Sequence, residues 1–193
     1  MRHFLIWVGL LAIPIFAIAL TWKSPLLQWR EPVYISAGFA GVLGLVFLMF
    51  QPLLILGVLP GVKGAKARRI HKAIGLALVL SVLLHIFGLW LTSPPDVVDA
   101  LLFASPTWFA PFGVVAMWAV FAAALMVVFR KVLRLPPRLW RRVHLGLAVT
   151  AVVGTIMHAV LIDGTMELYT KVFLCLATGT AMGALLHSQR DKI

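Results

Sequence analysis

The sequence contains a single cysteine, Cys175, among 193 residues. One cysteine cannot form an intramolecular disulfide or a Cys-x-x-Cys redox pair, so dithiol chemistry within the chain is excluded. Cys175 lies inside an apolar run, where a free cysteine usually behaves as a small hydrophobic residue. We therefore expect it to be buried and inert.

Acidic residues are also scarce. Six Asp and Glu residues stand against 17 Lys and Arg residues, which gives a formal net charge of +11. Such a balance is typical of nucleic-acid-binding proteins when the basic residues form a patch on a folded soluble domain. Here the basic residues fall in short connections between apolar runs, and no connection is long enough to form such a domain. We therefore exclude nucleic acid as a partner.

Long polar segments are missing because hydrophobic residues make up 62% of the chain, compared with about 45 to 50% in soluble domains. A helix of about 20 apolar residues crosses a bilayer core of about 30 Å. The apolar runs lack the alternation of barrel strands, so helices are expected. They lie near residues 4–21, 34–58, 70–92, 108–129, 143–162 and 168–186.

The sequence thus predicts an all-α fold, an integral membrane six-helix bundle surrounded by membrane lipid. Residues 1–193 are expected to form one transmembrane domain. No Gly-x-Gly-x-x-Gly motif follows a strand, so we expect neither a soluble flavin domain nor a nicotinamide domain.

The basic residues predict the orientation of the bundle. Most of them fall on one side of the membrane, and the positive-inside rule places that side, with both termini, in the cytoplasm of a cell with this chain in its inner (plasma) membrane. The cytoplasmic group comprises Arg2, Lys63, Lys66, Arg68, Arg69, Lys72, Arg130, Lys131, Arg134, Arg138, Arg141, Arg142, Arg190 and Lys192, against Lys23, Arg30 and Lys171 outside. Alternatively, the first run is a signal peptide that is cleaved near Ala17-Ile18-Ala19.

Two segments of equal length share the same polar pattern. RRIHKAIGLALVLSVLLH runs from Arg68 to His85, and RRVHLGLAVTAVVGTIMH runs from Arg141 to His158. In each, two histidines are separated by fourteen positions, which is nearly four helical turns, or roughly 21 Å. Both histidines therefore share a helix face. If the third and fifth helices are parallel, His71 lies level with His144, and His85 lies level with His158.

These two histidine pairs favour a planar cofactor over a simple metal ion. A zinc site usually needs three or four protein ligands, and no Cys, Asp or Glu occurs at these depths. A haem needs only one axial nitrogen from each side, and histidine is a common axial ligand of its iron. The sequence therefore predicts two haems that are clamped between the third and fifth helices, one above the other.

Neighbouring residues are compatible with this interpretation. Four glycines lie close to the histidines along the helices: Gly75, Gly88, Gly146 and Gly154. They could leave room for the macrocycle or, equally, reflect only the frequency of glycine in transmembrane helices. Four arginines lie beside the inner pair: Arg68, Arg69, Arg141 and Arg142. They could bind the haem propionates through charge-assisted hydrogen bonds. Equally, they could serve only as the positive-inside signal.

At these residues the sequence resembles the ferric reductase-like transmembrane domain family, which includes the membrane portions of ferric-chelate reductases and NADPH oxidases. The resemblance covers about residues 35–186 and rests on the doubled His-x13-His pattern, on His-Lys-x-x-Gly from His71 to Gly75, and on Trp-x-x-x-His from Trp140 to His144. It implies a six-helix bundle with two non-covalent b-type haems. His71 and His144 would ligate the inner haem, and His85 and His158 the outer haem.

Full-length enzymes of this family continue into a cytoplasmic flavin and nicotinamide domain, whereas this chain ends seven residues after Leu186. The resemblance therefore implies that a partner, a cytoplasmic flavoprotein reductase, supplies FAD or FMN. In size and topology the chain also resembles the haem-binding membrane subunit that serves a periplasmic methionine sulfoxide reductase. That similarity suggests a periplasmic acceptor protein as a second partner.

The leading hypothesis is an oxidoreductase component that transfers electrons across the membrane. A cytoplasmic flavin or flavoprotein would be the donor, and a ferric chelate or a partner reductase outside would be the acceptor. A second hypothesis is a proton or ion transporter with a histidine relay, because histidine titrates near physiological pH. A third is a structural membrane anchor, which leaves the four intramembrane histidines unexplained.

Overall fold

The computed structural model describes residues 2–189 as helices joined by short connections. Six helices are long and apolar enough to cross a membrane, which confirms the predicted multi-pass helical fold. Residues 2–189 contain no strand. The long helices are α1 (Arg2–Trp22), α2 (Pro32–Leu56), α3 (Gly64–Thr92), α5 (Ala110–Val128), α7 (Pro137–Leu161) and α8 (Leu168–Gln189), and the short ones are η1 (Pro25–Leu27), α4 (Pro94–Leu101) and α6 (Arg130–Leu133).

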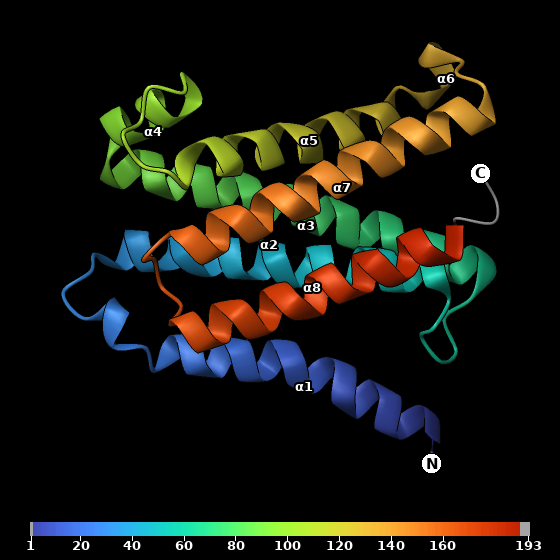
Figure 1. The fold of residues 1–193 in the computed structure, drawn as a ribbon, viewed down its shortest axis with the longest axis horizontal. Coiled ribbons are helices and arrows are strands. Elements are labelled where there is room, and N and C mark those ends of the chain that lie inside the picture. Colours follow the sequence, from blue (N-terminus) through green and yellow to red (C-terminus); the bar gives the residue numbers. More distant parts are fainter. Residues whose placement is uncertain (1, 190–193) are drawn as a thin grey trace.

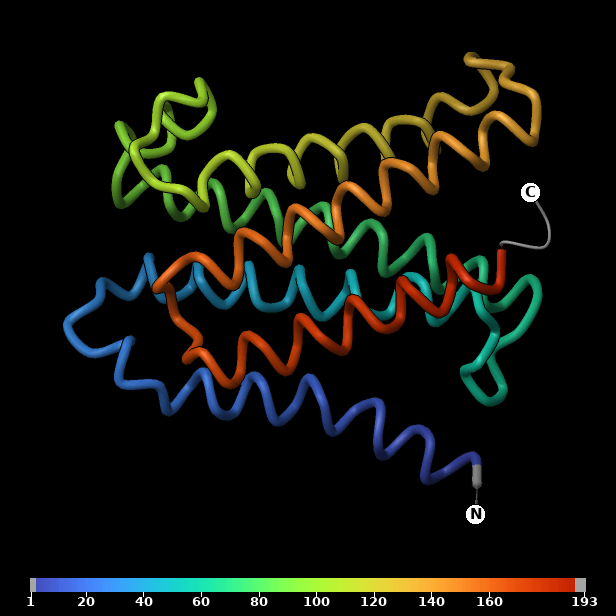
Figure 2. The backbone as a smooth tube through the Cα atoms, viewed as in Figure 1, coloured from blue at the N-terminus to red at the C-terminus, as the bar shows by residue number. Residues whose placement is uncertain are grey.

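The long helices run back and forth along the long axis of the molecule (Figures 1 and 2). The end that contains residues 57–72 and 130–144 carries most of the basic residues, and we call it the basic end. The opposite end, with residues 93–109 and 162–170, is called the acidic end because it holds Asp96, Asp99, Asp163 and Glu167. Helix α1 begins and α8 ends at the basic end. Arg190, Asp191 and Lys192 lie outside the described residues.

Helices α3 and α7 begin earlier than the sequence indicated. Their first residues are Gly64 and Pro137, each six positions before the predicted starts at 70 and 143. The four arginines Arg68, Arg69, Arg141 and Arg142 therefore lie on helices, not in loops, and all are exposed. Arginine and lysine are good helix formers, and proline is favoured in the first turn. A helix can therefore continue past the apolar run on which the prediction was based.

Two helical hairpins with equivalent contacts form the centre of the bundle. Helix α2 packs along α3, and α5 packs along α7, whereas α3 and α7 make little direct backbone contact. Gly88 lets α2 approach closely, because a Cβ atom there would lie 2.7 Å from the Ala37 Cβ. Gly154 plays the same part toward α5, where a Cβ would lie 2.9 Å from the Phe112 oxygen. Helix α8 packs across α2 and α7, and α1 lies at the edge, against α8 and α2.

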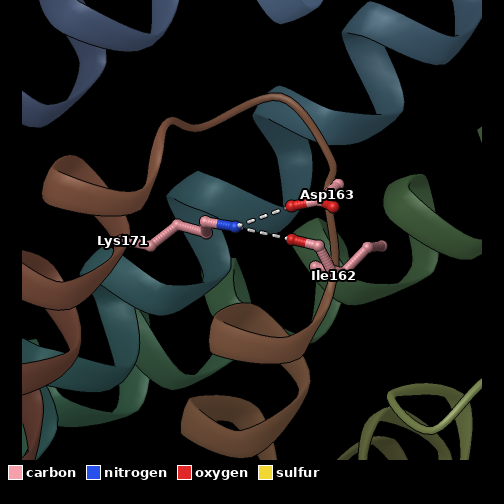
Figure 3. Close-up of polar contacts among 3 residues, drawn as sticks. All are labelled: Ile162, Asp163 and Lys171. Atoms are coloured by element: carbon pink, nitrogen blue, oxygen red, sulfur yellow. Dashed lines mark hydrogen bonds and ion pairs between the residues drawn. The ribbon is translucent and has the colours of Figure 1, made fainter.

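A buried lysine fixes the connection between α7 and α8 at the acidic end (Figure 3). The sequence placed Lys171 among the outer basic residues, but its side chain is only 4% exposed. Lys171 Nζ donates a hydrogen bond of 2.7 Å to the Ile162 carbonyl and lies 3.7 Å from Asp163 Oδ1. A buried ammonium is tolerated when it is paired and hydrogen-bonded in this way. The lysine thus holds the C-terminus of α7, one turn after His158.

Candidate functional site: two histidine pairs

The structure brings the four predicted histidines together in two pairs, each with one residue from α3 and one from α7. The ring centres of His71 and His144 lie 6.5 Å apart, at an interplanar angle of 65°. Those of His85 and His158 lie 6.4 Å apart, at 81°. We call these the basic-end pair and the acidic-end pair. The two helices are thus parallel, and their histidines are level at two depths.

The ring separations fit a metal ion held between two imidazoles. A histidine nitrogen binds a transition metal at about 2 Å. In a five-membered ring with bonds of about 1.33 Å, each nitrogen lies about 1.1 Å from the ring centre. Two rings on opposite sides of one metal therefore have centres about 6.3 Å apart. Any interplanar angle is compatible, because each ring plane needs only to contain its own metal–nitrogen bond.

Main-chain carbonyls orient both rings of the acidic-end pair. His85 Nδ1 is 2.8 Å from the Ala37 oxygen of α2, and His158 Nδ1 is 3.0 Å from the Phe109 oxygen at the start of α5. A carbonyl can only accept, so each Nδ1 carries the proton and each Nε2 presents a free lone pair. This is the arrangement of ligating histidines, in which a hydrogen bond on one nitrogen fixes the ring and prepares the other for the metal.

Glycines on the neighbouring helices make these two hydrogen bonds sterically possible. Gly41 follows Ala37 by one helical turn, and a Cβ there would lie 3.1 Å from His85 Nδ1. Gly113 follows Phe109 by one turn, and its Cβ would lie 2.6 Å from His158 Nδ1. Both distances are too short for a comfortable contact, so the imidazoles occupy space that only glycine leaves free. Neither Gly41 nor Gly113 was predicted to contact a histidine.

The four glycines that lie close to the histidines along α3 and α7 have different surroundings. Gly88 and Gly154 bring helices together, as described above, which favours a packing role for both. Gly146 has nothing within 4 Å of an added Cβ. Gly75 has only the Gln51 amide nitrogen, at 3.4 Å.

The basic-end pair has a different environment. His71 Nδ1 and His144 Nδ1 are buried and have no hydrogen-bond partner. The indole of Trp140 stacks on His144, with ring centres 5.0 Å apart and planes inclined by 7°. On Trp140, in turn, lies the guanidinium of Arg130, 4.7 Å from the ring centre. The half-buried indole of Trp140 thus contacts a candidate ligand directly.

The equivalent positions at the basic end carry different residues. Fourteen residues along α2 from Ala37 lead to Gln51, opposite His71, and fourteen along α5 from Phe109 lead to Ala123. One turn after these residues stand Ile55 and Val127, where the acidic-end pair has glycine. Both of these side chains are exposed.

Other donor sets are poorer candidates. Within residues 2–189, no three or more His, Cys, Asp or Glu side chains gather at a point that could hold a metal ion. A zinc site with three or four ligands is therefore not supported. The ion pair between Lys171 and Asp163 is the only one in the described part of the chain. The four arginines near the basic-end pair thus have no carboxylate partner there.

Comparison with known proteins identifies the family. Residues 37–155, more than half of the chain, match the family described as ferric reductase like transmembrane component. The chain belongs to this family. The match is shorter than the predicted range of about 35–186, and it ends three residues before His158. No curated protein and no solved structure matched the chain.

Membership in the ferric reductase-like family gives the two hairpins a general function. Members are transmembrane electron-transfer components, so this multi-pass membrane chain works with redox cofactors and a redox partner. The matched range covers α3 and α5 and most of α2 and α7. These are the helices that carry the histidines and the carbonyl and glycine contacts of the acidic-end pair.

Proposed function

We propose that the chain is a di-haem b-type cytochrome that conducts electrons across the membrane. The observation that carries this proposal is the pair of ring separations, 6.5 and 6.4 Å, at two depths between the same two helices. His71 and His144 would hold one haem, and His85 and His158 the other. When bound, each haem supplies an iron that takes up and releases one electron, a chemistry that no side chain here provides.

The protein's own contribution is to orient the ligands and to exclude water. The carbonyls of Ala37 and Phe109 hold the Nδ1 protons of the acidic-end pair, so that both Nε2 atoms remain free to ligate. Between the two levels lies a buried apolar layer. Leu78 is seven residues from both histidines of α3, Ala151 is seven residues from both histidines of α7, and both are buried in one hydrophobic cluster.

The same layer argues against a histidine relay. A relay of ionisable side chains between the two levels needs such groups along α3 and α7, and residues 73–84 and 145–157 contain none. The histidine hydrogen bonds of the acidic-end pair also end on main-chain carbonyls, not on acids. Both observations favour a ligand role.

The charge distribution suggests the direction of transfer. We assign the basic end to the cytoplasm of a cell with this chain in its inner membrane. A reduced FAD or FMN on a cytoplasmic flavoprotein would donate there. The acceptor outside would be a ferric chelate or a partner such as a periplasmic methionine sulfoxide reductase. Outward movement of one electron across a negative-inside membrane is favourable by about 2.3 kcal/mol per 100 mV.

Arg68, Arg69, Arg141 and Arg142 would serve the basic-end site. All four are exposed and lie within one turn of His71 or His144. They would bind the propionates of the haem held there or an anionic group of the flavin donor, because both are acceptors for charge-assisted hydrogen bonds.

The decisive experiment is to measure the haem content of the purified protein. Optical spectra before and after dithionite reduction, with a pyridine haemochromogen assay, should show about two b-type haems per chain. One haem per chain would limit the function to a single centre. If none bound after expression with ample haem, the proposal would fail.

A further inference from the structure

The basic-end pair has an unpaired donor and an unpaired acceptor in contacting residues. Gln51 of α2 donates from Nε2 to the main-chain oxygen of His71, at 3.3 Å. Its other amide atom, Oε1, is buried without a partner. His71 Nδ1 is likewise buried without a partner. An unsatisfied buried polar group costs about 1 to 3 kcal/mol, so two such groups in contacting residues call for an explanation.

The chemistry of a ligating histidine supplies one. When Nε2 binds a metal, Nδ1 must carry the proton and seeks an acceptor. At the acidic end, main-chain carbonyls fill this role for both rings. At the basic end, His71 Nδ1 meets no acceptor within hydrogen-bond distance. The unpaired Oε1 of Gln51 is an acceptor in a residue that already contacts His71.

Gln51 has the required groups and the freedom to use them. A carboxamide presents one acceptor and two donors, and its terminal torsion is broad, so the amide can turn at small cost. Gly75 lies beside the amide, where an added Cβ would be 3.4 Å from Nε2, at ordinary contact distance. Residue His71 in turn offers both complementary atoms, its carbonyl oxygen and its Nδ1 proton.

We propose that Gln51 is a positioning residue for His71, which accepts the Nδ1 proton on Oε1 while Nε2 donates to the His71 carbonyl. This inference rests on the proposed function, because the Nδ1 proton is fixed only when Nε2 ligates. This side-chain acceptor is present on only one of the two hairpins. The equivalent position on α5 is Ala123, which has no polar side-chain atom. Gln51 therefore tunes one ligand of one site.

A stronger acceptor on Nδ1 makes the imidazole a better electron donor and stabilises the oxidised iron. Replacement of Gln51 should therefore move the reduction potential of one centre only. We expect Gln51→Met, which keeps the size but removes both hydrogen bonds, to raise that potential. Gln51→Glu, which keeps an acceptor and adds charge, should lower it. The centre at the acidic end serves as the reference within the same molecule.

The experiment is a redox titration of both variants, with electron paramagnetic resonance of the oxidised proteins. The g values of one low-spin ferric signal should shift in Gln51→Met, because they report the axial ligand's orientation and basicity. Ala123→Glu supplies the control for charge alone, since it places a carboxylate at the equivalent position of the other hairpin. If Gln51→Glu lowers the potential no more than Ala123→Glu does, the hydrogen bond is refuted.

Two further outcomes separate this inference from the proposed function. If the wild-type protein binds haem and Gln51→Met leaves both potentials and both signals unchanged, only the role of Gln51 is overturned. If Gln51→Met loses haem, Gln51→Glu should restore it. Equal loss in both variants would assign Gln51 to helix packing and would overturn the inference. If the wild-type protein binds no haem, the failure lies in the proposed function itself.

Discussion

The two histidine pairs are alike in their ligands and different in what supports them. Each pair joins α3 to α7 with rings about equally far apart, 6.5 Å at the basic end and 6.4 Å at the acidic end. At the acidic end, backbone carbonyls and two glycines hold the rings. At the basic end, the Trp140 ring stacks on His144, and the Gln51 side chain donates to the main-chain oxygen of His71. The repeat thus preserves the ligands and varies their supports.

This difference determines how easily each site can change. A carbonyl cannot be replaced by point mutation, so the orientation of the acidic-end rings follows from the packing of the helices. Side chains can be exchanged one at a time, which makes the basic-end site adjustable. The following predictions test this contrast, beginning with the largest expected effect.

Removal of one ligand should separate the sites. We expect His158→Ala to lower the haem content from about two to about one per chain and to abolish electron transfer across the membrane, because an axial ligand is lost. The basic-end centre should keep its spectrum. His187→Ala, at an exposed histidine of α8, is the matched control. Two haems in His158→Ala would contradict the assignment of His158.

A single methyl group at Gly113 should damage the acidic-end site alone. In Gly113→Ala the Cβ would lie 2.6 Å from His158 Nδ1, so the ring must lose its carbonyl bond. Loss of such an outer hydrogen bond typically weakens binding about 10- to 100-fold. Haem dissociation rates measured by transfer to apomyoglobin would show it.

Substitutions at two other glycines test whether the effect depends on the distance between the added Cβ and the histidine. Gly41→Ala should act more weakly, because its Cβ would lie 3.1 Å from His85 Nδ1. Gly146→Ala should leave haem binding unchanged, since nothing lies within 4 Å of its Cβ. If all three substitutions had the same effect, the steric argument would be refuted.

Trp140 should matter only for the basic-end site. An aromatic stack contributes about 0.5 to 1.5 kcal/mol, so Trp140→Ala should speed haem loss from this site by up to about tenfold. Trp140→Phe keeps a stacking ring and should lose haem more slowly. Dissociation kinetics would distinguish the variants, with Trp118→Phe, on the exposed face of α5, as the control. Faster loss from the acidic-end site would contradict the contact with His144.

The arginines should produce the smallest change. Exposed charge pairs contribute about 0.2 to 1 kcal/mol, so Arg141→Gln should weaken haem binding at the basic end by less than about fivefold, and less at high salt. Lys131→Gln removes an equally exposed charge more than two turns from His144 along the chain. If the two variants bound haem equally well, Arg141 would contribute only to the orientation of the chain in the membrane and not to haem binding.

The sequence was sufficient for features that repeat along one helix. Apolar runs predicted the six long helices, and the spacing from His71 to His85 predicted a shared face and hence the two levels. It was not sufficient for contacts between helices. Gly41 and Gly113 act on histidines more than forty positions away, and their role depends on a register that no local pattern contains. The only available signal was their matched position in two runs that carry no histidine.

The burial of charged and aromatic side chains could not be predicted for a related reason. Trp140 and His144 lie four positions apart on one helix face, but the sequence does not show that their rings stack. Lys171 was placed with the outer basic residues, and nothing in the sequence indicated that its side chain is buried in the first turn of α8. In both cases the packing of neighbouring elements determines the burial.

The two equivalent hairpins also have a consequence for assembly. Neither hairpin contains a complete site, because each contributes one imidazole to each pair. In effect, the binding sites are subunit interfaces of a dimer whose halves are joined in one chain. Separation of the two hairpins would therefore open both sites at once. A ligand that binds one histidine from each hairpin would couple the folding of one hairpin to that of the other.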